Sequence, residues 1–170
     1  MATERLIILC GLPGSGKSTW AADAIAQFEE EHKTVSYCSR DAIRFSMLSN
    51  TDRYFAHERE VWRTYVDNIN ESLRTGIDIV ICDATHISAA SREKLLKRLE
   101  YDIDTNLEVI FFDLPPMECI SRNAQREGRA KVPPQSIIQM AEMLEVPKIE
   151  EFTKYYFHSV QICIKGGGQD

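Results

Sequence analysis

The chain has 170 residues, with 20 Lys and Arg against 26 Asp and Glu, so its formal net charge is −6. This length fits one ordinary domain, and 44% hydrophobic with 27% charged residues excludes a disordered or fibrous protein. The acidic balance argues against a protein that coats nucleic acid or an anionic membrane with one broad basic face, although a local basic channel is compatible with it. No apolar run approaches the length of about 20 residues that spans a bilayer, and the opening segment lacks the pattern of a signal peptide. We therefore expect no membrane partner and a cytoplasmic location.

Short apolar runs alternate along the chain with segments that have helical spacing. The runs are rich in Ile, Val and Cys without polar alternation, which is typical of strands buried on both faces of a parallel sheet. In chain order we expect a strand at 6–10, a helix at 18–31, a strand at 35–38, a helix at 56–74, a strand at 77–82, a helix at 89–101, a strand at 107–114, helices at 117–126 and 134–144, and a strand at 160–164. This alternation predicts an α/β fold with a parallel five-stranded sheet and helices on both faces. We expect one domain over residues 1–165 and a flexible tail at 166–170.

A glycine-rich segment follows the first expected strand and leads directly into the first expected helix. It satisfies G-x-x-x-x-G-K-[ST], the pattern of a P-loop, and so predicts a three-layer P-loop NTPase fold. Glycines let backbone N–H groups turn toward phosphate oxygens, and the helix N-terminus adds the positive end of its dipole. We expect Lys17 to bridge the β- and γ-phosphates of ATP and Ser18 to ligate Mg²⁺. The expected nucleotide-binding residues of this loop are Gly11, Leu12, Pro13, Gly14, Ser15, Gly16, Lys17, Ser18 and Thr19.

A P-loop alone indicates nucleotide binding and does not separate a kinase from a GTPase, a motor or a switch. Guanine-specific switch proteins usually carry an Asn-Lys-x-Asp motif after a later strand, and this sequence has none. We therefore do not expect a GTPase, and the acceptor has to be found elsewhere in the chain.

Asp41 follows the second expected strand, at the sheet edge where ligands bind in open α/β folds. An ionised carboxylate there can orient and deprotonate an attacking hydroxyl during phosphoryl transfer. Arg44 lies three residues further on, so both side chains share one face if a helix starts at Asp41. The alternatives are an N-cap role for Asp41 and a solvated surface position for Arg44.

Asp83 follows the third expected strand, which is the position of a Walker B carboxylate that holds Mg²⁺ directly or through water. It could instead orient an arginine or cap a helix. His86, close by, is expected to be a loop residue rather than a catalytic base, because Asp41 already fills that role.

A basic segment near residues 117–133 is expected to form a lid over ATP. Arg122 and Arg126 are spaced i, i+4 and would project from one helical face, and Gly128 lets the chain turn after them. These two residues, with Arg129, would supply the charge stabilisation that phosphoryl transfer needs. The alternative is an ordinary exposed basic helix end.

The segment at 53–63 interleaves aromatic and basic side chains near the expected acceptor entrance. Base stacking and phosphate attraction there would suit single-stranded ends. An amphipathic helix that buries Phe55, Val61 and Trp62 explains the same pattern equally well.

Four blocks together resemble the kinase domains of polynucleotide 5′-kinases from phage and bacterial nucleic-acid repair enzymes. They are GLPGSGKST at 11–19, SRDAIR at 39–44, VICDAT at 80–85 and SRNAQREGRAKVP at 121–133. The resemblance implies that Asp41 is the general base, that Arg44 clamps the acceptor phosphate next to the reacting 5′-OH, and that Arg126 contacts the donor phosphates. The D-x-D-x-T/V signature of the phosphatase that is fused to some of these kinases does not follow the kinase part, so we expect a kinase only.

The leading hypothesis is an ATP- and Mg²⁺-dependent kinase that phosphorylates a nucleic-acid 5′ end or a nucleotide acceptor. Its closest rival keeps the chemistry but uses a small-molecule or tRNA-linked hydroxyl. A third hypothesis is a nucleotide-binding module without transfer activity, which would need neither Asp41 nor Arg126. Arg44 separates the first two, because a neutral metabolite offers it no phosphate. The sequence carries no signal for an oligomeric state.

Overall fold

The computed structural model describes residues 1–166, without the side chain of Arg129. Residues 167–170 of the expected tail lie outside the described residues, and Gly166 is the last residue of the final strand. Within residues 1–166, no helix combines the length and the apolar character needed to cross a bilayer.

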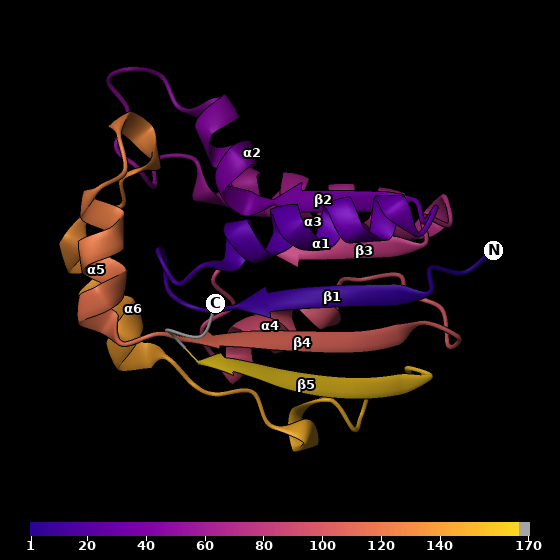
Figure 1. Cartoon of the computed structure of the whole chain (residues 1–170). Helices are drawn as coiled ribbons and strands as arrows, with labels where there is room; N and C mark the ends of the chain where they lie inside the picture. The colour runs from indigo at the N-terminus through magenta and orange to yellow at the C-terminus, as the bar shows by residue number, and fades with distance from the viewer. Residues whose placement is uncertain (167–170) are drawn as a thin grey trace.

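One parallel sheet of five strands forms the centre of the molecule (Figure 1). Its spatial order is β2-β3-β1-β4-β5, and every neighbouring pair is parallel. The strands are β1 (Arg5–Cys10), β2 (Val35–Ser39), β3 (Ile79–Asp83), β4 (Asn106–Asp113) and β5 (Ser159–Gly166). The parallel five-stranded α/β sheet expected from the apolar runs is therefore confirmed.

Helices cover both faces of the sheet, because β1 is apolar on both of its faces. Ile7 and Leu9 face α1 (Lys17–Glu30) and pack in one cluster with Phe28. Alternate residues of the same strand face α3 (Glu58–Arg74) and α4 (Ala89–Leu96), where Ile8 packs in a second cluster with Tyr65. The result is the three-layer arrangement that the alternating elements predict.

The remaining helices stand at or near the carboxyl ends of the strands. They are α2 (Arg40–Met47), α5 (Pro116–Ala124) and α6 (Pro134–Met143), with two short 3₁₀ turns at η1 (Gly128–Ala130) and η2 (Ile149–Glu151). Figure 1 shows α2 on one side of this end and α5 with α6 on the other. Of these elements, α2, α5, α6 and η1 surround the region where the P-loop, Asp41 and Asp83 lie, whereas η2 lies beside β5.

The helix expected at 89–101 ends early, and the cause is a tertiary contact. The buried side-chain amide of Asn70 on α3 donates to the carbonyl of Arg98 at 2.9 Å and accepts from the N–H of Glu100 at 2.8 Å. This captures backbone groups that a longer helix would use internally. The prediction that the helix continues to residue 101 is therefore wrong, and α4 ends at Leu96.

Candidate active site

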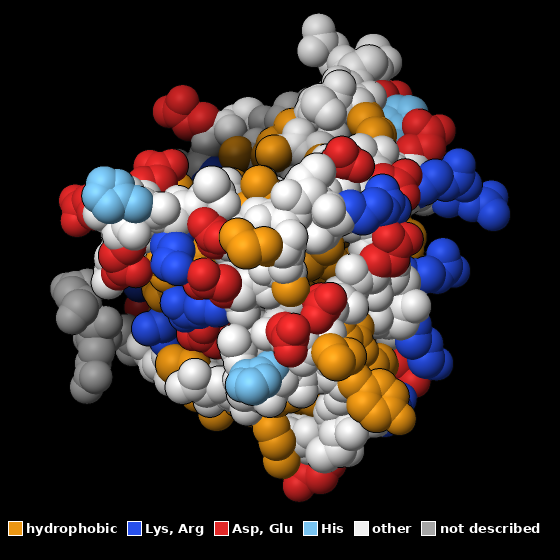
Figure 2. Space-filling view, turned by 90° about the vertical axis from the view of Figure 1, so that its right-hand side faces the viewer, with side chains coloured by type: hydrophobic (Ala, Val, Ile, Leu, Met, Phe, Trp, Pro, Cys, Tyr) orange, Lys and Arg blue, Asp and Glu red, His pale blue; other side chains and the backbone are white. Residues whose placement is uncertain are grey.

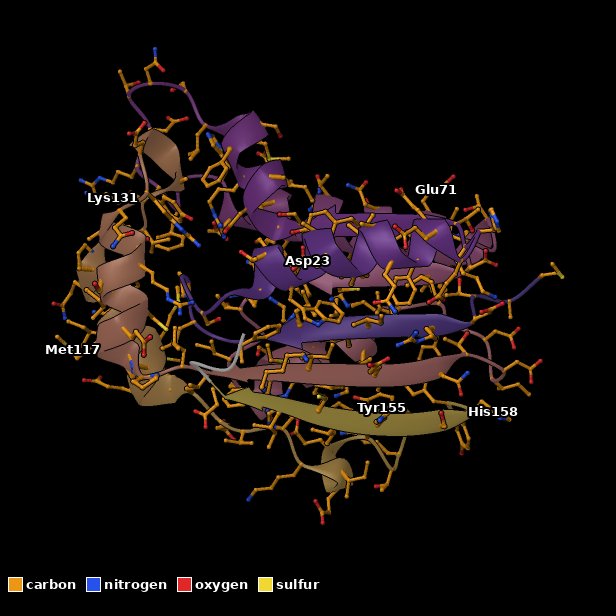
Figure 3. The ribbon with its side chains drawn as sticks, viewed as in Figure 1. Asp23, Glu71, Met117, Lys131, Tyr155 and His158 are labelled. Atoms are coloured by element: carbon orange, nitrogen blue, oxygen red, sulfur yellow. The ribbon has the colours of Figure 1, made fainter. Side chains whose placement is uncertain are left out.

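A cavity of about 220 Å³ opens at the carboxyl ends of β1, β2 and β3. Figure 3 shows side chains from α2 and from the opposite wall reaching into the space between them, with Met117 and Lys131 marking that opposite wall. Most residues expected to form the site line this cavity: Pro13, Gly14, Gly16, Lys17, Ser18, Thr19, Asp41, Arg44, Asp83, Arg122 and Arg126. The loop residues Gly11, Leu12 and Ser15 do not line it.

The P-loop is held in place by close backbone packing against α5. Gly14 has φ of 82°, and a Cβ there would lie 2.6 Å from the carbonyl oxygen of Cys119 on α5. Only glycine allows both this conformation and this approach. Leu12 is buried in one cluster with Cys119 and Val132, so the loop and the lid segment share an apolar anchor.

Lys17 is only 8% exposed and lies folded over the loop. Its Nζ donates to the carbonyl oxygens of Gly11 at 2.9 Å and Leu12 at 2.8 Å. Burial lowers the pKa of Lys17, and the charges of Asp83 and Asp41 oppose that effect. The ammonium group is thus placed where the loop would wrap around phosphates.

Ser18 and Asp83 meet although they are far apart in the sequence. The hydroxyl of Ser18 donates to Oδ2 of Asp83 at 2.9 Å, and the hydroxyl of Tyr37 donates to the same oxygen. Burial and the neighbouring Asp83 carboxylate raise the pKa of Tyr37, so this hydroxyl stays protonated. Hydroxyl and carboxylate oxygens are ligands that Mg²⁺ prefers, and the residues fit that ion. Asp83 caps no helix, because it ends β3.

Asp41 lies in the first turn of α2, and the N-cap of that helix is Ser39, whose Oγ accepts from the N–H of Ala42 at 3.2 Å. The N-cap alternative for Asp41 is therefore wrong. Asp41 accepts from Arg44 Nη1 and from the hydroxyl of Tyr54 at 3.5 Å, both through Oδ1. Among the described side chains, which do not include that of Arg129, Oδ2 of Asp41 has no hydrogen-bond partner.

Arg44 is 7% exposed, which rules out the solvated surface position. Glu58 binds it side-on through Nε and Nη2, the latter at 3.0 Å. The rings of Tyr54 and Phe55 lie 5.0 and 5.3 Å from its guanidinium carbon. Burial opposes the charged form, but the hydrogen bond and charge of Glu58 outweigh it and raise the pKa of Arg44. The guanidinium is therefore charged and held rigidly.

Arg122 on α5 and Arg126 after it both line the cavity. α5 ends at Ala124, so Arg126 lies beyond the helix and does not share a helical face with Arg122 as the i, i+4 spacing predicted. Asn123 causes this turn, since its amide donates to the carbonyl of Val132 at 2.7 Å and accepts from the same residue's N–H at 2.9 Å. The Arg129 side chain lies outside the described part of the chain.

His86 is a buried loop residue, as expected, and its ring contacts the end of β1 and α3. Its Nδ1 lies 2.6 Å from the carbonyl oxygen of Leu9, which can only accept, so Nδ1 carries the proton and Nε2 accepts from Tyr65 at 3.1 Å. Burial lowers the pKa of His86 to about 4. The neutral imidazole thus links the end of β1 to α3, and the guanidinium of Arg92 on α4 donates to the backbone carbonyl of His86 at 2.8 Å.

Sequence reasoning missed several side chains of this site, among them Glu58 and Tyr37. Glu58 binds both Arg44 and Arg40, yet it is one of many acidic residues at a helix start. Tyr37 is a half-exposed strand residue beside β3. No local pattern marks either one, because each acts on a partner that is distant in the sequence.

The model of one family, described as an AAA domain (AAA_33), matches residues 6–147. No curated protein sequence matches the chain.

Three solved structures illustrate the structural likeness. A Pnkp1/Rnl/Hen1 complex matches at 25% identity and a TM-score of 0.56, covering 72% of this chain and 40% of the matched chain. The APS kinase CysC of Mycobacterium tuberculosis, in complex with AMPPNP and APS, has 19% identity, a TM-score of 0.56 and coverages of 74% and 71%. A fungal RNA kinase has 13% identity, a TM-score of 0.58 and coverages of 95% and 75%. The chain thus spans less than half of the matched chain in the Pnkp1 complex.

Proposed function

The chain belongs to the AAA_33 family of AAA domains, and on that premise we propose that it is an ATP- and Mg²⁺-dependent kinase of nucleic-acid 5′-hydroxyl groups. The observation that carries the proposal is the placement of Asp41 and a buried, charged Arg44 in the same cavity as the P-loop. A carboxylate suits a hydroxyl acceptor, and a rigid guanidinium suits a phosphate next to it.

The acceptor side works through proton removal and positioning. Oδ2 of Asp41 takes the proton of the 5′-hydroxyl as its oxygen attacks the γ-phosphorus, and the bond to the β–γ bridging oxygen breaks to release ADP. Three of the five N–H groups of Arg44 already bind Asp41 and Glu58, so one N–H on each Nη remains for the acceptor phosphate. Glu58 fixes the direction of this fork.

The donor side works through charge stabilisation. The loop backbone holds the phosphates, while Lys17, Arg122 and Arg126 surround the charge that develops on the transferred group. Ser18 and Asp83 would hold Mg²⁺, which supplies charge neutralisation at the β- and γ-phosphate oxygens. The likeness to an APS kinase in complex with AMPPNP supports an adenine nucleotide as donor.

The deciding experiment incubates the chain with γ-labelled ATP and four acceptor classes: 5′-OH oligonucleotides, nucleoside 3′-phosphates, nucleosides and small alcohols. We expect label on the first two classes and much weaker label on the others. Labelling of small alcohols alone would replace the proposal with a small-molecule kinase. No labelling of any acceptor, with ATP still bound, would favour the nucleotide-binding module. An Asp41→Asn variant is the control for contaminating kinases, because it should abolish every genuine signal.

A further inference from the structure

A second hollow lies on the outer face of α3 and α4, next to the cavity. It has a volume of about 520 Å³ and is lined by Arg40, Glu58, Arg59, Trp62, Arg63, Val66, Asp67, Lys94 and Arg98. Five of these residues are basic and two are acidic, so the formal charge of this basic groove is +3 in a chain of net charge −6. Such local separation of charge is a feature of anion-binding surfaces.

Four of the five cations are exposed and not neutralised by neighbours. Within the described residues, no ion pair involves any of them: Arg59, Arg63, Lys94 and Arg98. Arginines and lysines elsewhere commonly do have acidic partners, as Arg74 has in Glu100 at 2.7 Å and Lys97 in Glu93 at 2.9 Å. Figure 2 shows the end of the sheet away from the cavity, where Lys and Arg are interspersed with Asp and Glu. The groove therefore differs from that end of the molecule in charge pattern.

Trp62 lines the groove and contacts two of its cations. Its ring is contacted by Lys94, with Nζ 4.6 Å from the centroid, and by Arg40, with the guanidinium carbon at 5.4 Å. These contacts fix two cations that come from different helices. The ring contacts cations in this structure, whereas the sequence pattern left base stacking by the segment and burial of Trp62 in an amphipathic helix both open.

Arg40 connects the groove to the cavity, since it lines both. It is bound by Glu58 at 3.0 Å, and the same carboxylate holds Arg44. A chain that leaves the cavity past Arg44 would reach Arg40 and then the exposed cations of the groove. A mononucleotide in the cavity would be too short to reach the groove.

We propose that the basic groove binds the backbone phosphates of a single-stranded nucleic acid downstream of its 5′-terminal nucleotide. This rests on the proposed function and adds that the acceptor is a polymer rather than a mononucleotide. The groove offers charge without a set of base-reading side chains, so binding should depend on salt and little on sequence.

The test uses the variant Arg63→Gln/Arg98→Gln, since both side chains are exposed and neither lines the cavity. The acceptor is a 5′-OH oligonucleotide of about twelve nucleotides, within the usual range of single-strand site sizes. We expect its KM to rise about 5- to 30-fold. For a nucleoside 3′-phosphate, kcat/KM should change by less than about twofold, because neither substituted side chain lines the cavity that would hold this acceptor. Binding of the same oligonucleotide without ATP, followed by fluorescence anisotropy, should lose about 1.4 from its log–log salt slope, at about 0.7 per phosphate contact.

The matched control is Lys148→Gln/Lys165→Gln, which removes the same charge from exposed positions outside the groove. Equal loss of oligonucleotide affinity in both double variants would overturn the groove, as would equal effects on the oligonucleotide and the nucleoside 3′-phosphate. Polyglutamate that competes as well as polynucleotide would assign the groove to an acidic protein and also overturn the proposal. If wild type labels no 5′-OH acceptor, the proposed function fails, and the binding measurement still decides the groove separately.

Discussion

Arg44→Ala should weaken transfer to a nucleoside 3′-phosphate far more than transfer to the same nucleoside without that phosphate. The guanidinium keeps two N–H groups free after binding Asp41 and Glu58, and a hydrogen bond to a charged group contributes about 1.5 to 3 kcal/mol. At 1.36 kcal/mol per decade, kcat/KM for the phosphorylated acceptor should fall by roughly 10- to 150-fold beyond any loss common to both acceptors.

The common loss is itself a consequence of the structure. Removing this side chain leaves the carboxylates of Asp41 and Glu58 without their shared partner, so the position of Asp41 changes for every acceptor. Four kcat/KM values, for wild type and Arg44→Ala with each acceptor, cancel this effect and leave the coupling energy. Arg44→Lys keeps the charge without the fork and should give a smaller coupling.

Arg122→Ala is the donor-side control and should affect both acceptors alike. A coupling for Arg44→Ala within about 0.3 kcal/mol of zero would refute the reasoning, because it would mean that the guanidinium does not contact the acceptor phosphate. The best residue-level reason for a nucleic-acid acceptor would then be lost.

Three other outcomes are expected. Lys17→Met preserves the volume of a buried side chain and should lower transfer by at least about 10²-fold with little change in unfolding midpoint; unchanged turnover would show that this loop is not the donor site. Asp41→Asn should keep ATP affinity, measured by calorimetry, and lose transfer; equal loss of both would place Asp41 on the donor side. The pKa of His86 is about 4 in the fold against 6.5 when unfolded, so the unfolded state gains the proton first as pH falls. Stability should therefore drop between about pH 6.5 and 4 by up to about 3 kcal/mol in urea titrations, and a His86→Gln variant with the same pH slope would contradict this.

The sequence by itself determined the fold class and the position of the P-loop. Apolar runs without alternation predicted strands buried on both faces, and the glycine-rich segment between the first strand and the first helix predicted the P-loop. Both signals are local: side-chain periodicity and glycine conformation depend on residues close together in the chain. Local patterns also placed Asp41 and Asp83 at the carboxyl edge of the sheet, because each lies at or just after the end of an expected strand.

Only the tertiary structure decided how these residues are held and where the helices stop. Asn70 on α3 ends α4 by binding the backbone groups that follow it. Asn123 binds the backbone of Val132, and the chain turns so that Arg126 lies outside α5. Glu58 on α3 binds Arg44 on α2, and the basic groove brings together cations from α2, from α3, from α4 and from the segment after α4. Each of these contacts joins positions that the sequence separates by nine residues or more. The free energy of these contacts depends on which elements pack side by side, and no short sequence pattern predicts that packing.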